Sequence, residues 1–165
     1  MAQTTRIIAR LELKSAHVIK GIRMEGLRQV GAPGELATRY AQHGADEIIL
    51  EDIVASLYDR PFDPGHINTV ARSAYLPLSF SGRIQSVEDA MVALRAGADK
   101  IAVNSAALND PALIDRLTAS IGAQSVIGMI QAKKRTGGGW EPMWLSGRER
   151  SHRDLRDWAQ ELQAR

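Results

Sequence analysis

The stretch KIAVNSAAL (residues 100–108) is a short apolar run that ends in polar residues, and the same form recurs along the chain. Four other stretches share it: RIIARLELK (6–14), EIILEDIVAS (47–56), LPLSFSGRI (76–84) and SVIGMIQAKK (125–134). Residues with helical periodicity lie between most of these runs. Strands that alternate with helices predict βαβ crossovers and a parallel sheet. Because binding and catalysis in such sheets collect where the strands end, the polar strand ends are the first candidate site.

The composition is typical of one domain with a substantial hydrophobic core. The chain has 165 residues, of which 44% are hydrophobic, and a net charge of only +2. It contains no cysteine, which excludes disulfides and thiolate chemistry. The start MAQTTRIIAR lacks the apolar segment of a signal peptide, and no run approaches the roughly 20 apolar residues of a membrane span. We therefore expect a cytoplasmic protein that binds neither membranes nor nucleic acid.

Hydrophobic spacing and capping residues predict the main elements between and after these runs. Helices are expected over 33–43, 63–73 and 112–120, after Ser86, and from about His152 to the last residues. Strands are expected over 47–52, 76–80, 100–103 and 125–130, followed by a hairpin tip within 133–139 and a returning strand over 140–145. The stretch 14–33 holds three glycines and is interpreted as a functional lid or a disordered segment.

A short motif occurs twice. Gly-Ala-Asp stands immediately before a predicted strand at residues 44–46 and again at 97–99. This echo indicates repeated βα units and does not by itself indicate a function.

Several motifs, in order and at near-constant spacing, resemble the cyclase subunit of imidazole glycerol phosphate synthase. They are IIARLELK (7–14), VIKG (18–21), GADE (44–47) with DIVAS (52–56), GADKIAVNSAA (97–107) and QAK (131–133). The likeness runs from about Arg6 to the last residue. The segment DIVASLY (52–58) and the opening IARL (8–11) are closer to paralogues in surface-sugar biosynthesis clusters.

The resemblance implies a (β/α)₈ barrel of which only about five βα units are present. We expect residues 1–165 to form a single partial barrel domain. An open parallel sheet leaves two edges and one apolar face uncovered. Two explanations stay open: the chain is a fragment, or another chain completes it, with self-association as one route.

Two residues fall on the family's acid–base positions. Glu12 ends the first strand and Gln131 ends the fifth, and both positions hold aspartate in the active family. Glu12 keeps a carboxylate that lies one methylene further out. Gln131 carries an amide, which cannot exchange a proton at neutral pH, and loss of an acid–base group costs about 10²–10⁴-fold in rate. We therefore expect impaired catalysis.

Other positions match the family's ligand contacts. The phosphate turn falls on Ser81, Gly82 and Arg83, where successive backbone N–H groups can cradle an anion. Arg83 replaces a family glycine and adds positive charge that can also fill the anion's space. The resemblance further assigns ligand contacts to three unchanged residues: Lys20, Asn104 and Ser105. Asp52 ends a strand, where it either lines the site or caps a loop.

The amino ends of the strands carry charges that the resemblance relates to a partner. Arg6, Glu47 and Lys100 match a ring of charges through which ammonia enters the barrel, and Asp99 matches a residue that faces the glutaminase. A heterodimer with a glutaminase subunit is therefore expected. The resemblance implies no cofactor, and the four histidines show no metal-binding spacing.

Two classes of function remain open. The first is a cyclase or lyase of the histidine-biosynthesis type, which uses glutaminase-derived ammonia on a phosphorylated ribotide. The second is a non-catalytic paralogue that keeps a phosphate-binding or glutaminase-docking surface, or a subunit of sugar amidation in surface-polysaccharide synthesis. Gln131 and Arg83 favour the second class, whereas Lys20, Asn104 and Ser105 favour the first.

Overall fold

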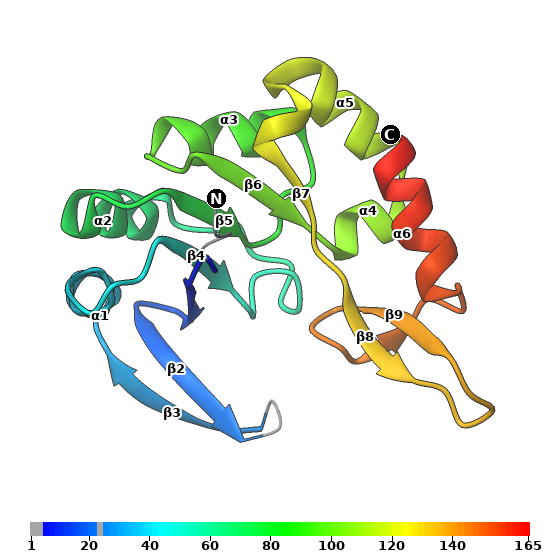
Figure 1. Cartoon of the computed structure of the whole chain (residues 1–165), viewed down its shortest axis with the longest axis horizontal. Coiled ribbons are helices and arrows are strands. Elements are labelled where there is room, and N and C mark those ends of the chain that lie inside the picture. The colour runs from blue at the N-terminus through cyan, green and yellow to red at the C-terminus, as the bar shows by residue number, and fades with distance from the viewer. Residues whose placement is uncertain (1–4, 23–24) are drawn as a thin grey trace.

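The computed structural model describes residues 5–22 and 25–165, and it contains an open sheet with helices along its outer side (Figure 1). The sheet has seven strands in the order β3-β2-β1-β4-β5-β6-β7. Along the order β1-β4-β5-β6-β7, each strand is parallel to its neighbours in the sheet. Strand β2, in contrast, pairs antiparallel with both β1 and β3. The bounds are β1 (Ile8–Lys14), β2 (His17–Ile22), β3 (Glu25–Gly31), β4 (Glu47–Asp52), β5 (Leu78–Ser81), β6 (Lys100–Val103) and β7 (Val126–Gly128).

Six α-helices and a second sheet complete the described part of the chain. The helices are α1 (Pro33–Gln42), α2 (Pro64–Ala74), α3 (Val87–Arg95), α4 (Ser105–Asn109), α5 (Ala112–Ile121) and α6 (Leu155–Ala164). The second sheet is antiparallel and consists of β8 (Gln131–Lys134), β9 (Trp140–Trp144) and β10 (Glu149–Arg150). Among residues 5–22 and 25–165, no helix combines the length and apolar character of a membrane span.

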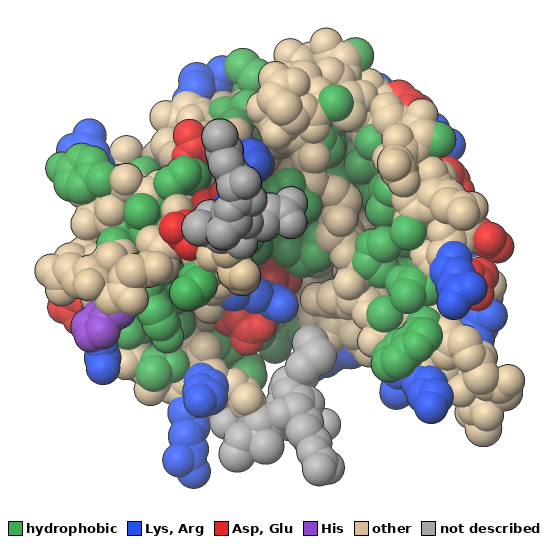
Figure 2. Space-filling model, viewed as in Figure 1, with side chains coloured by type: hydrophobic (Ala, Val, Ile, Leu, Met, Phe, Trp, Pro, Cys, Tyr) green, Lys and Arg blue, Asp and Glu red, His purple; other side chains and the backbone are tan. Residues whose placement is uncertain are grey.

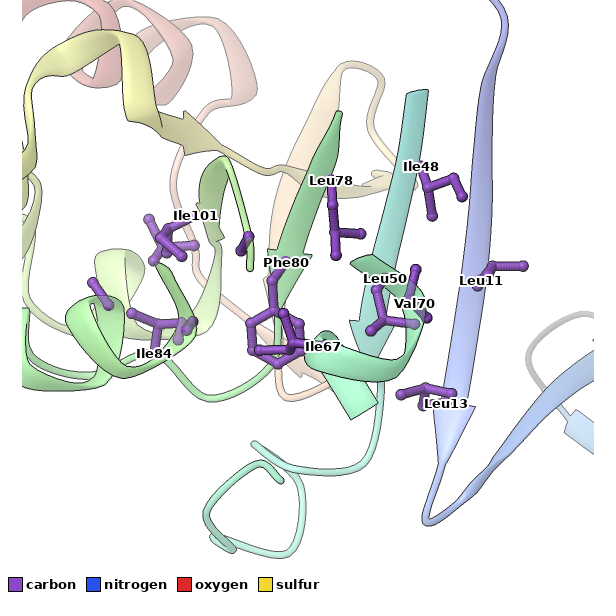
Figure 3. Packing of buried hydrophobic residues seen from close by; sticks show 14 of the residues in the cluster. Leu11, Leu13, Ile48, Leu50, Ile67, Val70, Leu78, Phe80, Ile84 and Ile101 are labelled. Atoms are coloured by element: carbon purple, nitrogen blue, oxygen red, sulfur yellow. The ribbon is translucent and has the colours of Figure 1, made fainter. Parts of the chain in front are cut away.

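The two faces of the parallel sheet differ in chemistry because successive side chains of a strand alternate between faces. On the helix-covered face, Leu11, Leu50, Phe80 and Ile101 are at most 1% exposed and belong to one core cluster (Figure 3). Strand pairing places the opposite face in register, so that five side chains form one line across it. We call this line the inner row: Glu12, Glu51, Ser81, Ala102 and Ile127.

Most predicted elements are confirmed, and the fold class expected from the resemblance is the one observed. The strands over 47–52 and 100–103 have the predicted bounds. The main sheet is the open, five-parallel-strand part of a (β/α)₈ barrel that does not close. The returning strand over 140–145 is β9, and the last predicted helix is α6.

For residues 14–33 the alternative of a disordered segment is wrong, because this stretch contains the antiparallel pair β2 and β3, and the lid role stays a prediction. The pairing has irregular register between Val18 and Ile19, which places two adjacent side chains in the interior. A bulge of this kind breaks the alternation by which a strand is recognised in a sequence.

The predicted strand over 125–130 divides in two. Its first part is β7 in the main sheet, and the chain then leaves that sheet and pairs in the second sheet as β8. The helix α4 after β6 was not predicted, because its five residues are too few to show periodicity.

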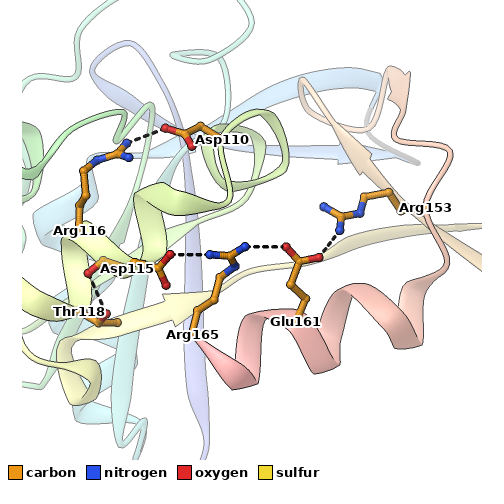
Figure 4. Close-up of polar contacts among 7 residues, drawn as sticks. All are labelled: Asp110, Asp115, Arg116, Thr118, Arg153, Glu161 and Arg165. Atoms are coloured by element: carbon orange, nitrogen blue, oxygen red, sulfur yellow. Dashed lines mark hydrogen bonds and ion pairs between the residues drawn. The ribbon is translucent and has the colours of Figure 1, made fainter.

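Helix α6 fixes the second sheet to the main sheet. Trp158 is fully buried, and Leu162 packs so closely on Gly128 that a Cβ there would lie 2.9 Å from Leu162 Cδ1. Arg165 pairs with Asp115 of α5 at 2.5 Å and with Glu161 at 3.2 Å (Figure 4). The same end of the molecule therefore combines apolar packing with a chain of ion pairs.

The repeated Gly-Ala-Asp motif has one structural role in both places. The backbone N–H of Asp46 donates to the Ile7 carbonyl at 2.8 Å, and its carboxylate accepts from the Ile7 N–H at 2.7 Å. Asp99 makes the same pair of bonds with Leu78, at 2.7 and 2.8 Å. Each aspartate thus ties the start of its own strand to the residue at the start of the neighbouring strand.

We expect Asp46→Ala and Asp99→Ala each to lower the free energy of unfolding by roughly 1–2 kcal/mol, because each removes a charge-assisted hydrogen bond to a backbone N–H. Urea denaturation measures the change. The exposed Glu35 of α1 provides a control, since Glu35→Ala should stay within about 0.5 kcal/mol of the wild type. Two aspartate variants as stable as the wild type would contradict the role assigned to the motif.

Candidate functional site

A cavity of about 370 Å³ lies at the carboxyl ends of β4, β5 and β6. Its wall is formed by the segments that follow these strands together with Gln131 of β8 and the end of β9. Acidic and basic side chains gather in the hollow at the centre of the face shown in Figure 2. The second sheet therefore closes one side of a site that begins at the parallel strand ends.

Buried polar atoms without hydrogen-bond partners are concentrated at this cavity. Within the described residues, four such side-chain atoms also lack an ion pair, and three of the four belong to residues of the cavity wall. An unpaired buried polar group costs roughly 1–3 kcal/mol, so a ligand that supplies partners recovers this free energy. The three atoms are Asn104 Oδ1, Gln131 Oε1 and Trp144 Nε1, whereas Glu51 Oε2 is paired with Arg10 at 2.5 Å.

Asn104 and Ser105 connect the end of β6 to the second sheet. Asn104 Nδ2 donates to the Met143 carbonyl at 3.1 Å, and Ser105 Oγ accepts from the Leu145 N–H at 3.0 Å. Because Asn104 uses its amide nitrogen in this bond, its oxygen is left for the cavity. Gln131 pairs with Met143 in the second sheet. The structure thus brings Asn104, Ser105 and Gln131 together as expected, while their roles toward a ligand stay predictions.

The turn after β5 leaves no room for a side chain at its centre. A Cβ on Gly82 would lie 2.9 Å from Phe80 Cζ and 3.0 Å from Asp52 Cβ. Arg83 adopts a left-handed conformation with φ of 50°, which costs a non-glycine residue roughly 1–2 kcal/mol. Its guanidinium pairs with Asp59 at 2.7 Å. The backbone conformation at Arg83 is therefore one that glycine adopts more easily than other residues. The carboxylate of Asp59 partly neutralises the charge of the Arg83 side chain.

Asp52 both lines the cavity and caps the loop that follows β4. Its Oδ1 accepts from the Val54 and Ala55 N–H groups at 3.2 and 3.0 Å, and its carboxylate pairs with Arg60 at 2.7 Å. Asp52 is 5% exposed. Asp52 can therefore line the site and cap the loop at the same time. Hydrogen bonds in the structure support the capping role.

Glu51 is the site residue that the sequence interpretation missed. It lies in the inner row between Glu12 and Ser81, lines the cavity and is 6% exposed. Arg10 lies between the two carboxylates, with Nη2 at 2.5 Å from Glu51 Oε2 and 3.1 Å from Glu12 Oε1. Burial raises the pKa of Glu51, Arg10 opposes that rise, and the nearby charges of Glu12 and Asp52 add to it. In the sequence, the feature that could have indicated Glu51 is the Glu51-Asp52 pair at the end of an apolar strand.

Two predicted site residues, the catalytic candidate Glu12 and the ligand candidate Lys20, do not reach the cavity wall. Glu12 is one strand further from it than Glu51, and its carboxylate is paired with Arg10. Lys20 is exposed on β2, opposite Arg28 of β3. The remaining predicted ligand residues, Asp52, Ser81, Gly82, Arg83, Asn104, Ser105 and Gln131, all lie on the wall.

The charges predicted to face a partner lie at the opposite ends of the strands. Arg6 forms an ion pair with Glu47 at the start of β4, and Lys100 begins β6. Asp99 precedes Lys100 and is engaged with Leu78 as described above. Among the residues that the structure describes, His, Cys, Asp and Glu form no group of three that could hold a metal ion.

Fold and site together define an open (β/α)₈-barrel protein with a ligand-sized cavity at its strand ends. The model of the family described as "Histidine biosynthesis protein" matches residues 6–165, and the chain belongs to this family. It is similar to three proteins named imidazole glycerol phosphate synthase subunit HisF. Identity is 46% over 154 residues with that of Legionella pneumophila, 41% over 162 with that of Myxococcus xanthus and 38% over 165 with that of Helicobacter hepaticus.

These alignments cover 93%, 98% and 100% of the chain and 73%, 64% and 66% of the three relatives, respectively. The chain thus spans about two thirds of the length of its relatives. The resemblance to imidazole glycerol phosphate synthase is confirmed, whereas the closer likeness to surface-sugar paralogues stays a prediction.

The raised pKa of Glu51 predicts how the stability of the fold depends on pH. A carboxyl whose pKa is higher in the folded chain stabilises the fold below its unfolded value of 4.5, and this contribution is lost as pH rises through the folded pKa. The variant Glu51→Gln carries no ionisable group at this position, so its free energy of unfolding does not fall with pH for this reason. Its stability relative to the wild type should therefore improve steadily as the pH is raised from about 4 to about 8.

Urea denaturation across that pH range measures the difference, and Glu35→Gln on α1 is the control for loss of an exposed charge. A stability difference between Glu51→Gln and the wild type that stays constant with pH would show that the Glu51 pKa is not raised.

Proposed function

We propose that this chain acts as the cyclase subunit of an imidazole glycerol phosphate synthase and binds a phosphorylated ribotide in the strand-end cavity. The observation that supports the proposal is the set of three unpartnered polar atoms around that cavity, Asn104 Oδ1, Gln131 Oε1 and Trp144 Nε1, in a chain related to HisF subunits. The phosphate would lie at the turn of residues 81–83, whose backbone N–H groups lie on the cavity wall and could bind an anion. The ribotide would extend from there toward Asn104 and Gln131.

Ring closure with ammonia requires groups that give and take protons, and this chain is poorly equipped at the family's two positions. Gln131 reaches the cavity but carries an amide, which does not titrate. Glu12 keeps a carboxylate, but that carboxylate pairs with Arg10 and lies off the cavity wall. We therefore propose slow turnover with ligand binding retained.

A second candidate is a non-catalytic paralogue that binds a sugar phosphate or docks a glutaminase. The amide at Gln131 and the guanidinium at Arg83 favour it, because the first replaces an acid–base group and the second adds a charged side chain at the phosphate turn. Measured turnover and measured binding distinguish the two candidates.

The partner surface would be the amino ends of the strands. Arg6, Glu47 and Lys100 place both signs of charge there, on the side of the sheet away from the cavity. Such a charged rim suits a partner that delivers ammonia through the sheet to the strand-end cavity. The edges β3 and β7 each have one neighbour in the described sheet, so further βα units or a second copy could extend it.

Restoring the family's residues tests the catalytic proposal. The double variant Gln131→Asp with Arg83→Gly should raise ammonia-dependent turnover of the ribotide by about 10²-fold or more, because it returns an acid–base group and frees the phosphate turn. Product release is measured with ammonium salt as the nitrogen source. Calorimetry on the same samples should show that wild type and variant both bind the ribotide.

Wild-type binding without any gain in turnover would reject the catalytic role and favour the paralogue. Failure of both proteins to bind the ribotide would reject the proposed site as well.

A charge reversal tests the partner proposal. Lys100→Glu should weaken binding to the glutaminase subunit by about tenfold or more, because opposed charges at an interface become like charges. Calorimetry measures the affinity, and Lys133→Glu, exposed on the second sheet, is the matched control. An affinity that is unchanged in Lys100→Glu would place the partner elsewhere.

A further inference from the structure

The turn between β9 and β10 crosses the strand-end cavity from one side to the other. The Leu145 N–H donates to Ser105 Oγ, directly after β6, at 3.0 Å. Ser146 Oγ donates to the Ile53 carbonyl, directly after β4, at 2.5 Å. Because β5 lies between β4 and β6 in the sheet, the turn spans the end of β5, where Ser81 lies. We call residues 145–147 the crossing turn.

The backbone of the crossing turn is strained. Leu145, Ser146 and Gly147 are left-handed in succession, with φ of 47°, 58° and 80°. Glycine adopts this region readily, whereas the leucine and the serine each lose conformational free energy there. Among residues 5–22 and 25–165, no other two adjacent residues besides glycines share this conformation. Such strain persists where neighbouring contacts hold the backbone in place, so the contacts of the turn decide its position.

The two hydrogen bonds across the cavity act against this strain. A net hydrogen bond and a left-handed residue contribute free energies of similar size and opposite sign, so the closed position of the turn is only weakly favoured. The side chains of Leu145 and Ser146 are half-buried, and residues 148–150 after the turn are exposed. The turn can therefore move away from the cavity without exposing the core.

The far end of the same segment is fixed. Arg150 in β10 pairs with the buried carboxylate of Glu141 at 3.3 Å, and the Ser151 N–H donates to the Pro142 carbonyl at 3.2 Å. Glu141 also accepts from the His152 N–H at 2.7 Å. These bonds hold the chain to β9 after the turn, so a movement of the turn would be confined to the residues between β9 and β10.

We propose that the crossing turn is a lid on the strand-end cavity and that the hydrogen bond from Ser146 to the Ile53 carbonyl is its latch. When the latch breaks, the turn leaves the end of β5, and Leu145 and Ser146 leave the cavity wall. The lid thereby sets the rate at which a ligand enters and leaves. This inference goes beyond the proposed function, because it applies to any ligand of the cavity.

A single engineered cysteine tests the lid, because the chain has no cysteine of its own. Ser81→Cys places a thiol at the end of β5, where Ser81 is 8% exposed. The rate at which this thiol reacts with a water-soluble aromatic disulfide measures how often the cavity is open. Adding Ser146→Ala removes the latch and should raise the rate about threefold to tenfold, because one net hydrogen bond is lost. Adding Ser105→Ala removes the second bond and should raise the rate in the same way.

Two control variants in the same Ser81→Cys chain separate lid opening from other effects. Ser120→Ala, at an exposed position of α5, should leave the rate unchanged. Asp46→Ala lowers the stability of the whole fold at the opposite ends of the strands, and it should also leave the rate unchanged. If Ser81→Cys folds poorly, Ala102→Cys on the same cavity wall takes its place.

Equal rates with and without Ser146→Ala would overturn the lid. A rise in Asp46→Ala as large as that in Ser146→Ala would also overturn it, because the thiol would then react through unfolding of the chain. A rise confined to Ser105→Ala would overturn the assignment of the latch to Ser146.

Discussion

The structure depends on the register of the parallel strands. Pairing of β1, β4, β5, β6 and β7 brings Leu11, Leu50, Phe80 and Ile101 onto one face, where the helices cover them. The same register must bring the alternate residues into line on the other face. The inner row is the result, and its polar members Glu12, Glu51 and Ser81 lead toward the cavity. A slip by one residue in any strand would bury the charges of this row and expose the core.

The cavity needs contacts that join distant parts of the chain. The parallel strands supply Glu51 and Ser81, but the opposite wall comes from β8 and β9, which the chain reaches only after leaving the main sheet. The bond from Asn104 to Met143 and the packing of Trp158 hold that second sheet in place. The polar atoms without partners at the site therefore lie among groups that are hydrogen-bonded or closely packed. This pattern is expected of a binding site in which a ligand supplies the missing hydrogen bonds.

Much of this arrangement could be predicted from the sequence because it follows from periodicity. The apolar runs that end in polar residues locate β1, β4, β5 and β6, and the rule that sites form at strand ends places Ser81, Asn104 and Gln131 on one cavity. The β2–β3 pair could not be predicted, since its bulge disrupts the alternation. Glu51 was missed for a related reason: within an apolar strand it counts as buried, and only strand pairing shows that it faces the cavity beside Arg10. Lys20 matched a motif, but its position depends on a hairpin that the motif does not describe.

We expect a phosphorylated ribotide or sugar phosphate to occupy the strand-end cavity and to contact the unpaired amide oxygens of Asn104 and Gln131. The most direct measurement is NMR of the side-chain amides of Asn104 and Gln131 during titration with ribose 5-phosphate. Both amide signals should shift and saturate together with the backbone signal of Gly82. Saturable binding that shifts signals elsewhere and leaves these three unchanged would contradict the account.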